Sequence, residues 1–395
     1  MYTPFVQAFE MMMTRMVPVV ATETVSLAES VGRILADDVL TDRPVPPFDR
    51  VAMDGYALQR ADLPGPITVL ETVPAGSPPT QTVVPGTCSK VMTGCMLPAG
   101  ADMVVQVELA LPESQGSVAF VPAAASLKTA NIAKVGEDAA QGQLFVEKHT
   151  PITPKITGIL ASVGIHAPRV FRRPVVAVVI TGDEVVEPHQ TPLLHQIRNA
   201  NGVQLVTQLI EAGAVPRYYG ITGDDPEALA AVFERAEAEC DGILVSGGVS
   251  MGDFDFVPDI LTSHGYEILF SKIAAKPGRP TTFAVSEGGW VFGMPGNPVT
   301  SFVVFEVMVK PFLLASMGAP LPLEVRMVLS RDISVKQSSR TTWLPCDVNG
   351  QGEVVPLDYH GSGHYHSLKN AWGLLHLEPG ETNIPRGSHV LVRPL

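Results

Sequence analysis

The sequence has 395 residues, with 27 Lys or Arg and 40 Asp or Glu, so its formal net charge is −13 at pH 7. Domains usually hold roughly 100–200 residues, which predicts two to four domains here. With 46% hydrophobic residues, the chain can build buried cores, and global disorder is excluded. The acidic balance argues against a nucleic-acid-binding protein, although a local cluster of cations can still bind a small anion.

Cysteine usage and hydropathy indicate the compartment. None of the four cysteines lies in a Cys-x-x-Cys pair, so their spacing encodes no zinc or redox motif. We find no secretory signal and no uninterrupted apolar run near ~18 residues. We therefore expect a cytoplasmic protein without a membrane or nucleic-acid partner. The charged fraction of 17% is low and favours a large buried or self-associating surface.

The N-terminal part of the chain predicts a helix and then a β-rich module. Apolar side chains at helical spacing indicate a core-facing helix; they are Phe5, Phe9, Met12, Met13 and Met16. A proline-rich stretch over residues 42–130 separates short β-type runs, at Ile67–Leu70, Val104–Val107 and Val118–Val121. Helical character returns at Thr153–Val163.

Strand and helix patterns alternate from Arg172 to about Leu314. The apolar β-branched run Val175–Ile180 is typical of a strand buried on both faces. Further strands are expected at Tyr218–Thr222, Ile243–Ser246 and Val291–Gly293. The helices between them should bury, in chain order, Val203, Val206, Leu209 and Ile210, then Leu229, Val232, Phe233 and Ala236. This alternation predicts a three-layer α/β domain with a mostly parallel sheet.

The last part of the chain returns to short β-type runs, at Val325–Leu329, Thr341–Cys346, Val354–Leu357 and Val390–Val392. We therefore predict a multidomain α/β protein with four parts. These are a split helical and linker domain (1–42 and 131–170), an inserted β-rich domain (43–130), the α/β domain (171–317) and a small β domain (318–395).

Polar turns follow three strands of the predicted sheet. Open parallel sheets bind ligands beyond the carboxyl ends of their strands. Asp183 and Glu184, the turn Gly247–Gly252 and the turn Pro295–Pro298 should therefore meet at one edge. The glycines can turn backbone N–H groups toward a phosphate or an oxyanion. A tight turn without a ligand is the alternative.

Charged residues in other turns point to the same kind of ligand. The stiff turn Lys276–Pro280 presents Lys276 and Arg279 close together, which suits a tetrahedral oxyanion; a solvated turn is the alternative. Carboxylates near such a ligand favour Mg²⁺, although each could instead cap a turn. The candidate carboxylates are Asp54, Asp138, Asp183, Glu184 and Asp255.

Seven motifs, in this order, resemble one family. They are Pro46–Asp49 with Ala52–Ala57; Thr93-Gly94 with Leu97–Asp102; Gly136–Asp138; Thr181–Glu184; Gly247–Ser250 with Gly252 and Asp255; Lys276–Gly278; and Pro295–Pro298. The sequence resembles the molybdopterin molybdenumtransferases, which include bacterial MoeA and the E domain of gephyrin. The resemblance implies an elongated homodimer whose active cleft lies between the α/β domain of one subunit and the N-terminal domains of the other.

The resemblance also implies a reaction, in which adenylylated molybdopterin and molybdate give molybdenum cofactor and AMP with Mg²⁺. It implies that Lys276 and Arg279 hold molybdate, with Thr300, Arg340 and Ser362. Gly247, Gly248 and Ser250 would bind the phosphate end of the pterin, and Pro295, Gly296, Asn297 and Pro298 would shape the pocket. Asp183, Glu184 and Asp255 would hold the metal. Glu184 and Asp255 would act in catalysis with Asp54, Thr93 and Asp138 of the partner subunit.

Two departures from the family pattern lie in the expected oxyanion site. Arg279 stands where the family usually has Lys, and a planar guanidinium differs from a compact ammonium. Thr300 stands where Ser is common.

Alternative functions are a molybdopterin-binding scaffold, a tungstate-handling paralogue and a molybdopterin adenylyltransferase. The adenylyltransferase of the preceding step is also a candidate partner.

Overall fold

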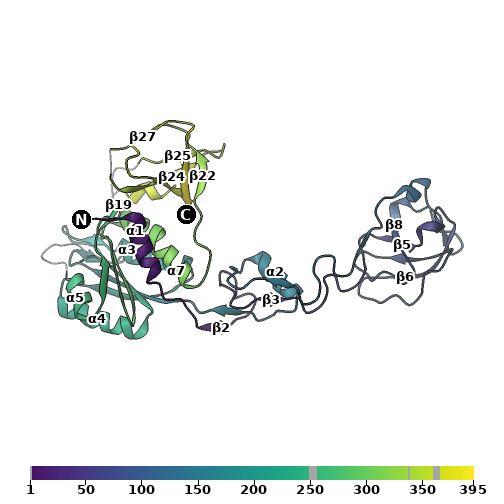
Figure 1. Ribbon diagram of the computed structural model, residues 1–395, viewed down its shortest axis with the longest axis horizontal. Helices are drawn as coiled ribbons and strands as arrows, with labels where there is room; N and C mark the ends of the chain where they lie inside the picture. Colours follow the sequence, from purple (N-terminus) through teal and green to yellow (C-terminus); the bar gives the residue numbers. More distant parts are fainter. Residues whose placement is uncertain (1, 249–255, 337–338, 359–364) are drawn as a thin grey trace.

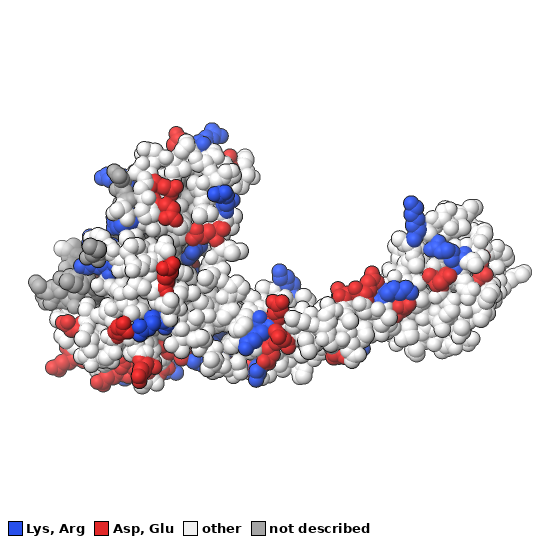
Figure 2. Space-filling view, in the orientation of Figure 1, with Lys and Arg blue, Asp and Glu red and all other residues white. Residues whose placement is uncertain are grey.

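The computed structural model describes residues 2–395 except 249–255, 337–338 and 359–364. The molecule is elongated: two adjoining lobes lie at one end, a narrow arm leads away from them, and a separate module lies at the other end (Figure 1). This arrangement confirms the predicted multidomain α/β fold. On the face shown in Figure 2, acidic side chains line the α/β lobe and the arm, with Lys and Arg scattered among them.

The distal module is a five-stranded sheet with the order β8-β5-β7-β6-β9. Its strands are β5 (Gly55–Leu58), β6 (Ile67–Val73), β7 (Thr87–Val91), β8 (Met103–Gln106) and β9 (Ser117–Val118). Short 3₁₀ turns accompany them at η1 (Arg60–Asp62), η2 (Val107–Leu109) and η3 (Pro122–Ser126). Both faces are covered by apolar residues, so the module has a core of its own. The last predicted strand is shorter than expected because Pro122 begins η3.

The arm consists of two passes of the chain that pair as three short antiparallel ribbons. The ribbons are β2 (Thr22–Thr24) with β12 (Arg169–Phe171), β3 (Val39–Leu40) with β11 (Leu144–Val146), and β4 (Arg50–Val51) with β10 (Ile132–Ala133). Helix α2 (Pro154–Ser162) packs here through Leu160 and confirms the helix expected at Thr153–Val163. The arm thus carries the distal module away from the rest of the chain (Figure 1).

The α/β lobe contains a six-stranded sheet with the order β16-β13-β17-β21-β20-β18. Its strands are β13 (Val175–Thr181), β16 (Val215–Thr222), β17 (Gly242–Ser246), β18 (Glu267–Phe270), β20 (Thr282–Ser286) and β21 (Gly289–Met294). The first four strands in this order are parallel to one another. Strand β20 pairs antiparallel with both of its neighbours, β21 and β18. A small parallel pair, β14 (Val185–Val186) and β15 (Ile197–Arg198), lies beside its carboxyl edge.

Helices cover both faces of this sheet. Helices α4 (Pro226–Glu239) and α5 (Val257–Ser263) bury one face. The other face is covered by α1 (Phe5–Thr14), α3 (Ala200–Glu211), α6 (Pro298–Val304), the π-helical turn η4 (Phe305–Val309) and α7 (Lys310–Ser316). The N-terminal apolar stripe joins this core through Met12, which confirms its predicted core role. The buried residues of α4 also match the prediction.

The predicted inward face of α3 is half right: Leu209 is buried and Val206 packs against the main core, but the other two predicted residues are exposed. In α3, the buried residues include Leu205, Gln208 and Leu209, whereas Val203 is 53% exposed and Ile210 is 59% exposed. The apolar spacing placed these two side chains inward because it gave no weight to Gln208, which is buried by donating to Glu306 Oε1 at 2.8 Å. The outer face of α3 is therefore unusually apolar.

The second lobe is a C-terminal β-sheet that also recruits two strands from earlier in the chain. The sheet order is β1-β19-β24-β26-β28-β22, with β25 paired to β24. Its strands are β1 (Thr3–Pro4), β19 (Ile273–Lys276), β22 (Val325–Val328), β24 (Thr341–Val348), β25 (Val354–Pro356), β26 (Gly373–Leu377) and β28 (His389–Pro394). A short pair, β23 (Ile333–Ser334) and β27 (Asn383–Ile384), and the turn η5 (Tyr365–Leu368) complete the lobe. The two recruited strands, β1 and β19, were not expected from the sequence.

The segment Pro298–Ser316 is the one helix in the described part of the chain that is long and apolar enough to span a membrane. Most of its apolar window, 78%, is buried inside the structure. Its Phe305 and Phe312 belong to the main core, and Phe312 stacks edge-on against Phe283 and Phe292. We therefore interpret it as the central core helix of the α/β lobe.

Candidate functional site

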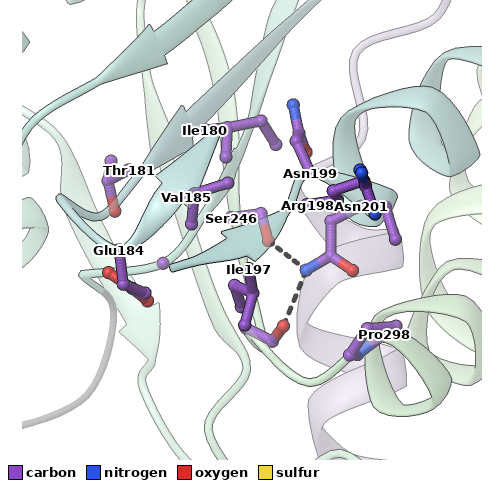
Figure 3. A pocket seen from close by; sticks show the side chains of 13 residues that line it. Ile180, Thr181, Glu184, Val185, Ile197, Arg198, Asn199, Asn201, Ser246 and Pro298 are labelled. Atoms are coloured by element: carbon purple, nitrogen blue, oxygen red, sulfur yellow. Dashed lines mark hydrogen bonds between the residues drawn. The ribbon is translucent and has the colours of Figure 1, made fainter. Parts of the chain in front are cut away.

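A pocket of about 70 Å³ lies at the carboxyl ends of the parallel strands. Glu184 follows β13, Gly247 follows β17, and both Gly296 and Pro298 follow β21. Figure 3 shows the lining side chains converging from these strand ends and from the start of α3. The sheet thus brings together most of the turns that the sequence placed at this edge.

Glu184 is held at the pocket by the turn that precedes it. Gly182 has φ +124°, and a Cβ at this position would lie 2.5 Å from Glu184 Oε2. The positive φ favours glycine at this position, and its lack of a side chain leaves room for the Glu184 carboxylate against the strand end. Asp183 differs from the prediction: its Oδ1 accepts from Asp224 N at 3.2 Å, so this carboxylate supports the neighbouring loop instead of lining the pocket.

Among the residues that the structure describes, two buried polar atoms of this pocket have no hydrogen-bond partner. They are Thr181 Oγ1 and Asn201 Oδ1, and their residues are 5% and 8% exposed. The other end of the Asn201 amide is fixed, since Nδ2 donates to Ser246 Oγ at 2.9 Å and to Gly296 O at 2.8 Å (Figure 3). Buried polar groups are rarely left unpaired. The pocket therefore offers a hydroxyl and an oriented amide oxygen to a ligand with hydrogen-bond donors.

The glycine turn after β17 starts with the geometry expected of an anion-binding nest. Gly247 has φ +100° and Gly248 has φ +61°. Successive residues of this kind can point their N–H groups to the same side. Ser250 and Asp255 lie outside the described residues, so their predicted roles stay predictions.

A second pocket, of about 340 Å³, adjoins the first because Gly296 lines both. Its lining residues are Lys276, Pro277, Gly278, Arg279, Pro280, Pro295, Gly296, Asn297, Thr300 and Arg340. The structure thus gathers three cationic side chains, the prolines and the Thr300 hydroxyl that the sequence assigned to an oxyanion. Ser362, the remaining member of that set, lies outside the described residues.

The distal module carries a different candidate group. Thr93 N and Thr93 Oγ1 both donate to Asp54 Oδ1, at 2.6 Å and 2.8 Å. The backbone hydrogen bond and then the hydroxyl hydrogen bond lower the pKa of Asp54 below its usual value. Asp54 is therefore an oriented, ionised carboxylate at the surface, suited to bind a cation or to orient water.

Asp138 lies near the distal module, on the returning pass of the arm. Its backbone N donates to Val45 O at 2.9 Å, and its side chain is exposed. Asp54 and Thr93 thus flank β5 and β7 of the distal module, whereas Glu184 follows β13 and Lys276 ends β19 in the lobes at the other end (Figure 1). A single chain does not bring these two sets together.

The side-chain donors of the strand-end pocket decide which metal ion it could hold. Within the described residues, no three side chains of His, Cys, Asp or Glu form a metal-binding cluster. Among the described residues that line the pocket, Glu184 is the one carboxylate. Mg²⁺ often needs only one or two protein carboxylates, because substrate phosphates and water complete its shell. The donor set therefore fits a Mg²⁺ that arrives with a phosphorylated ligand.

The asparagines at the start of α3 were not predicted as site residues. Asn199 Oδ1 accepts from Gly202 N at 2.8 Å, and its Nδ2 donates to Tyr218 Oη at 2.7 Å. The N-cap preference for asparagine before an apolar helix is a signal that could have marked this position. For Asn201 no such signal exists, because its role depends on Ser246 and Gly296, which are distant in sequence.

Three sequence-family models match the chain in consecutive order. A model described as "MoeA N-terminal region (domain I and II)" matches residues 3–164. One described as "Probable molybdopterin binding domain" matches residues 177–315. The third, "MoeA C-terminal region (domain IV)", matches residues 327–395.

Curated relatives and solved structures agree with these matches. The molybdopterin molybdenumtransferase of Bacillus subtilis strain 168 is 37% identical over 384 residues, which cover 94% of this chain and 89% of the relative. The protein of the same name from Haemophilus influenzae is 30% identical, with 94% of each chain covered. A crystal structure of the molybdopterin biosynthesis MoeA protein from Pyrococcus horikoshii OT3 superposes with a TM-score of 0.86 at 29% identity and covers all of both chains.

Proposed function

The chain belongs to the MoeA family of molybdopterin molybdenumtransferases, and we propose that it converts adenylylated molybdopterin and molybdate to molybdenum cofactor and AMP. The single observation that carries this proposal is the pair of adjoining pockets. One offers unpaired hydrogen-bonding atoms beside Glu184, and the other gathers three cations around a hydroxyl. A transferase that joins an organic substrate to a metal oxyanion needs both, side by side.

The cationic pocket is the proposed molybdate site. Molybdate is a tetrahedral dianion, and the protein as a whole carries a charge of −13. Local cations must therefore overcome a repulsive global field. Lys276 and Arg279 supply charge, and Thr300 supplies a hydroxyl that can donate to an oxyanion. The same chemistry accepts tungstate, so a tungstate-handling paralogue remains the second candidate.

The strand-end pocket is the proposed site for the pterin and its phosphates. Asn201 Oδ1 and Thr181 Oγ1 can accept hydrogen bonds from amino and ring N–H groups, and the Gly247–Gly248 turn can donate to phosphate. Glu184, which lines this pocket, would hold Mg²⁺ and would orient water beside the phosphoanhydride. Bound Mg²⁺ would neutralise charge that develops on the leaving phosphate.

We further propose that the active protein is a homodimer with a shared cleft. Asp54 and Thr93 belong to the distal module, beside β5 and β7, and Asp138 lies on the arm between β10 and β11, whereas Glu184 follows β13 in the α/β lobe at the other end (Figure 1). They can reach that pocket only from another chain. Exposed apolar side chains in and before α3 support such a contact; they are Leu193, Leu194, Ile197, Val203 and Ile210.

The remaining proposals concern location and partners. All four cysteines are free and three are buried, which is in keeping with a reducing cytoplasm. The adenylyltransferase that makes the adenylylated substrate is a proposed partner, since direct transfer would protect a labile intermediate. A scaffold without catalysis would have no need for the Glu184 turn.

The test is turnover with purified adenylylated molybdopterin, molybdate and Mg²⁺, with AMP release and molybdenum incorporation followed together. We expect both products to appear in step and both to stop when Mg²⁺ is removed. Tight binding of the substrate with neither product would instead favour the scaffold. Products formed with tungstate but not with molybdate would favour the tungstate paralogue.

The variant Glu184→Gln sharpens this test. We expect it to keep the fold and the oligomeric state and to lose at least about 100-fold in turnover, because the neutral amide can neither bind Mg²⁺ strongly nor orient water as a carboxylate does. Glu187→Gln is the matched control, since Glu187 bonds Tyr218 Oη and does not line the pocket. Normal turnover by Glu184→Gln would remove Glu184 from the catalytic set.

A further inference from the structure

The guanidinium of Arg279 is contacted by the N-terminal segment of the chain. Arg279 Nη1 donates to Tyr2 Oη at 3.4 Å. Arg279 Cζ lies 5.9 Å from the centre of the Tyr2 ring, which is within the range of a cation–π interaction. Tyr2 therefore contacts a residue that lines the cationic pocket, although Tyr2 itself lines a different pocket.

The backbones on both sides of this contact are fixed by one strand. Thr3 N donates to Lys272 O at 3.0 Å, and Thr3 lies opposite Ile273 in the parallel β1–β19 pairing. Ile273 N in turn donates to Arg279 O at 3.0 Å. Strand β19 thus sets the positions of both residues, and the approach of ring to guanidinium follows from the sheet.

The contact with a neutral Tyr2 ring leaves the positive charge of Arg279 available to bind an anion. Within the described residues, Arg279 is in none of the ion pairs, and its side chain is exposed. An exposed arginine loses rotamer freedom when it binds a ligand. A carboxylate partner would hold it but would also neutralise it. A neutral tyrosine ring restricts the side chain and leaves its charge available.

We propose that Tyr2 is a positioning residue that holds the Arg279 guanidinium at the mouth of the cationic pocket and thereby raises affinity for a tetrahedral oxyanion. Tyr2 does not touch the anion. The identity of that anion as molybdate rests on the proposed function, whereas the Tyr2–Arg279 contact does not.

The test measures molybdate binding by calorimetry and the molybdate dependence of turnover for wild type, Tyr2→Leu and Tyr2→Phe. We expect Tyr2→Leu to raise the Kd and the KM for molybdate by about 2- to 5-fold, with kcat at saturating molybdate unchanged. Tyr2→Phe keeps the ring face and should lie close to wild type. Val6→Ala is the matched control, because Val6 is an exposed apolar residue of the same segment.

Specificity for the guanidinium is tested in an Arg279→Met background. There, Tyr2→Leu should cause no further change in the Kd for molybdate. Equal effects of Tyr2→Leu in both backgrounds, or a loss of kcat at unchanged KM, would overturn the positioning role. If Tyr2→Leu has the same kcat and the same KM for molybdate as the wild type, this inference is overturned while the proposed function stands. A wild-type protein that neither binds molybdate nor releases AMP would overturn the proposed function, and this inference with it.

Discussion

Single residues of the site show what a sequence can and cannot encode. Lys276, Arg279 and Thr300 were named from the sequence, and the structure places all three in one pocket. Asp183 was expected beside Glu184, yet its carboxylate supports the Asp224 loop. Adjacent residues of one turn point in different directions, and only the surrounding backbone decides which one reaches the pocket.

At the residue scale, the Thr93–Asp54 hydrogen bonds predict a pH effect. Thr93→Val removes the hydroxyl that donates to Asp54 Oδ1, so the pKa of Asp54 should rise toward its ordinary value. If the ionised carboxylate is required, activity will then be lost at a higher pH as the solution is acidified. The acidic limb of the pH–rate profile should move upward for Thr93→Val and stay in place for Thr93→Ser. If the acidic limb of the pH–rate profile stays in place in both variants, the ionisation of Asp54 does not control the reaction rate.

Elements were easier to predict than their faces. The buried strand β13 and helix α4 followed directly from apolar runs and periodicity. Helix α3 was predicted, but its inward face was predicted only in part, because Gln208 and Asn201 are buried through hydrogen bonds that link it to other elements. Strand β19 was missed because its partners, β1 and β24, lie far away in the sequence.

At the element scale, the central helix depends on a buried charge pair. Glu306 is almost fully buried, and its Oε2 lies 2.9 Å from Lys310 Nζ. Burial acts to lower the pKa of Lys310, but Glu306 and Glu211 outweigh burial and raise that pKa above its ordinary value of 10.5. The stabilisation is therefore complete below pH 10.5 and is lost as pH rises through the raised pKa.

Removal of the buried partner should cost much more than removal of the exposed one. We expect Glu306→Ala to lower the free energy of unfolding by about 3 kcal/mol, because it leaves Lys310 partly buried without its main partner. Glu211→Ala is the control and should cost less than about 1 kcal/mol, since Glu211 is largely exposed. Urea unfolding followed by tryptophan fluorescence measures both. Equal losses of unfolding free energy in the two variants would show that burial of the carboxylate does not set the strength of its ion pair with Lys310.

The whole molecule explains why the site could be only half located from the sequence. The family resemblance implied that Asp54 and Glu184 serve one reaction from two different subunits, and the arm separates β5, which follows Asp54, from the α/β lobe that carries Glu184 (Figure 1). No local pattern states how far an arm extends. We propose that a second chain supplies the missing half of the site.

Mixed dimers test that claim most directly. Asp54→Ala and Glu184→Ala proteins, each inactive alone, are combined under conditions that exchange subunits, and native mass spectrometry verifies that mixed dimers form. A mixed dimer keeps one intact cleft, so random exchange should restore roughly a quarter of wild-type AMP release and molybdenum incorporation. The same mixture without exchange is the control. Verified mixed dimers without restored activity would contradict a cleft shared between two chains.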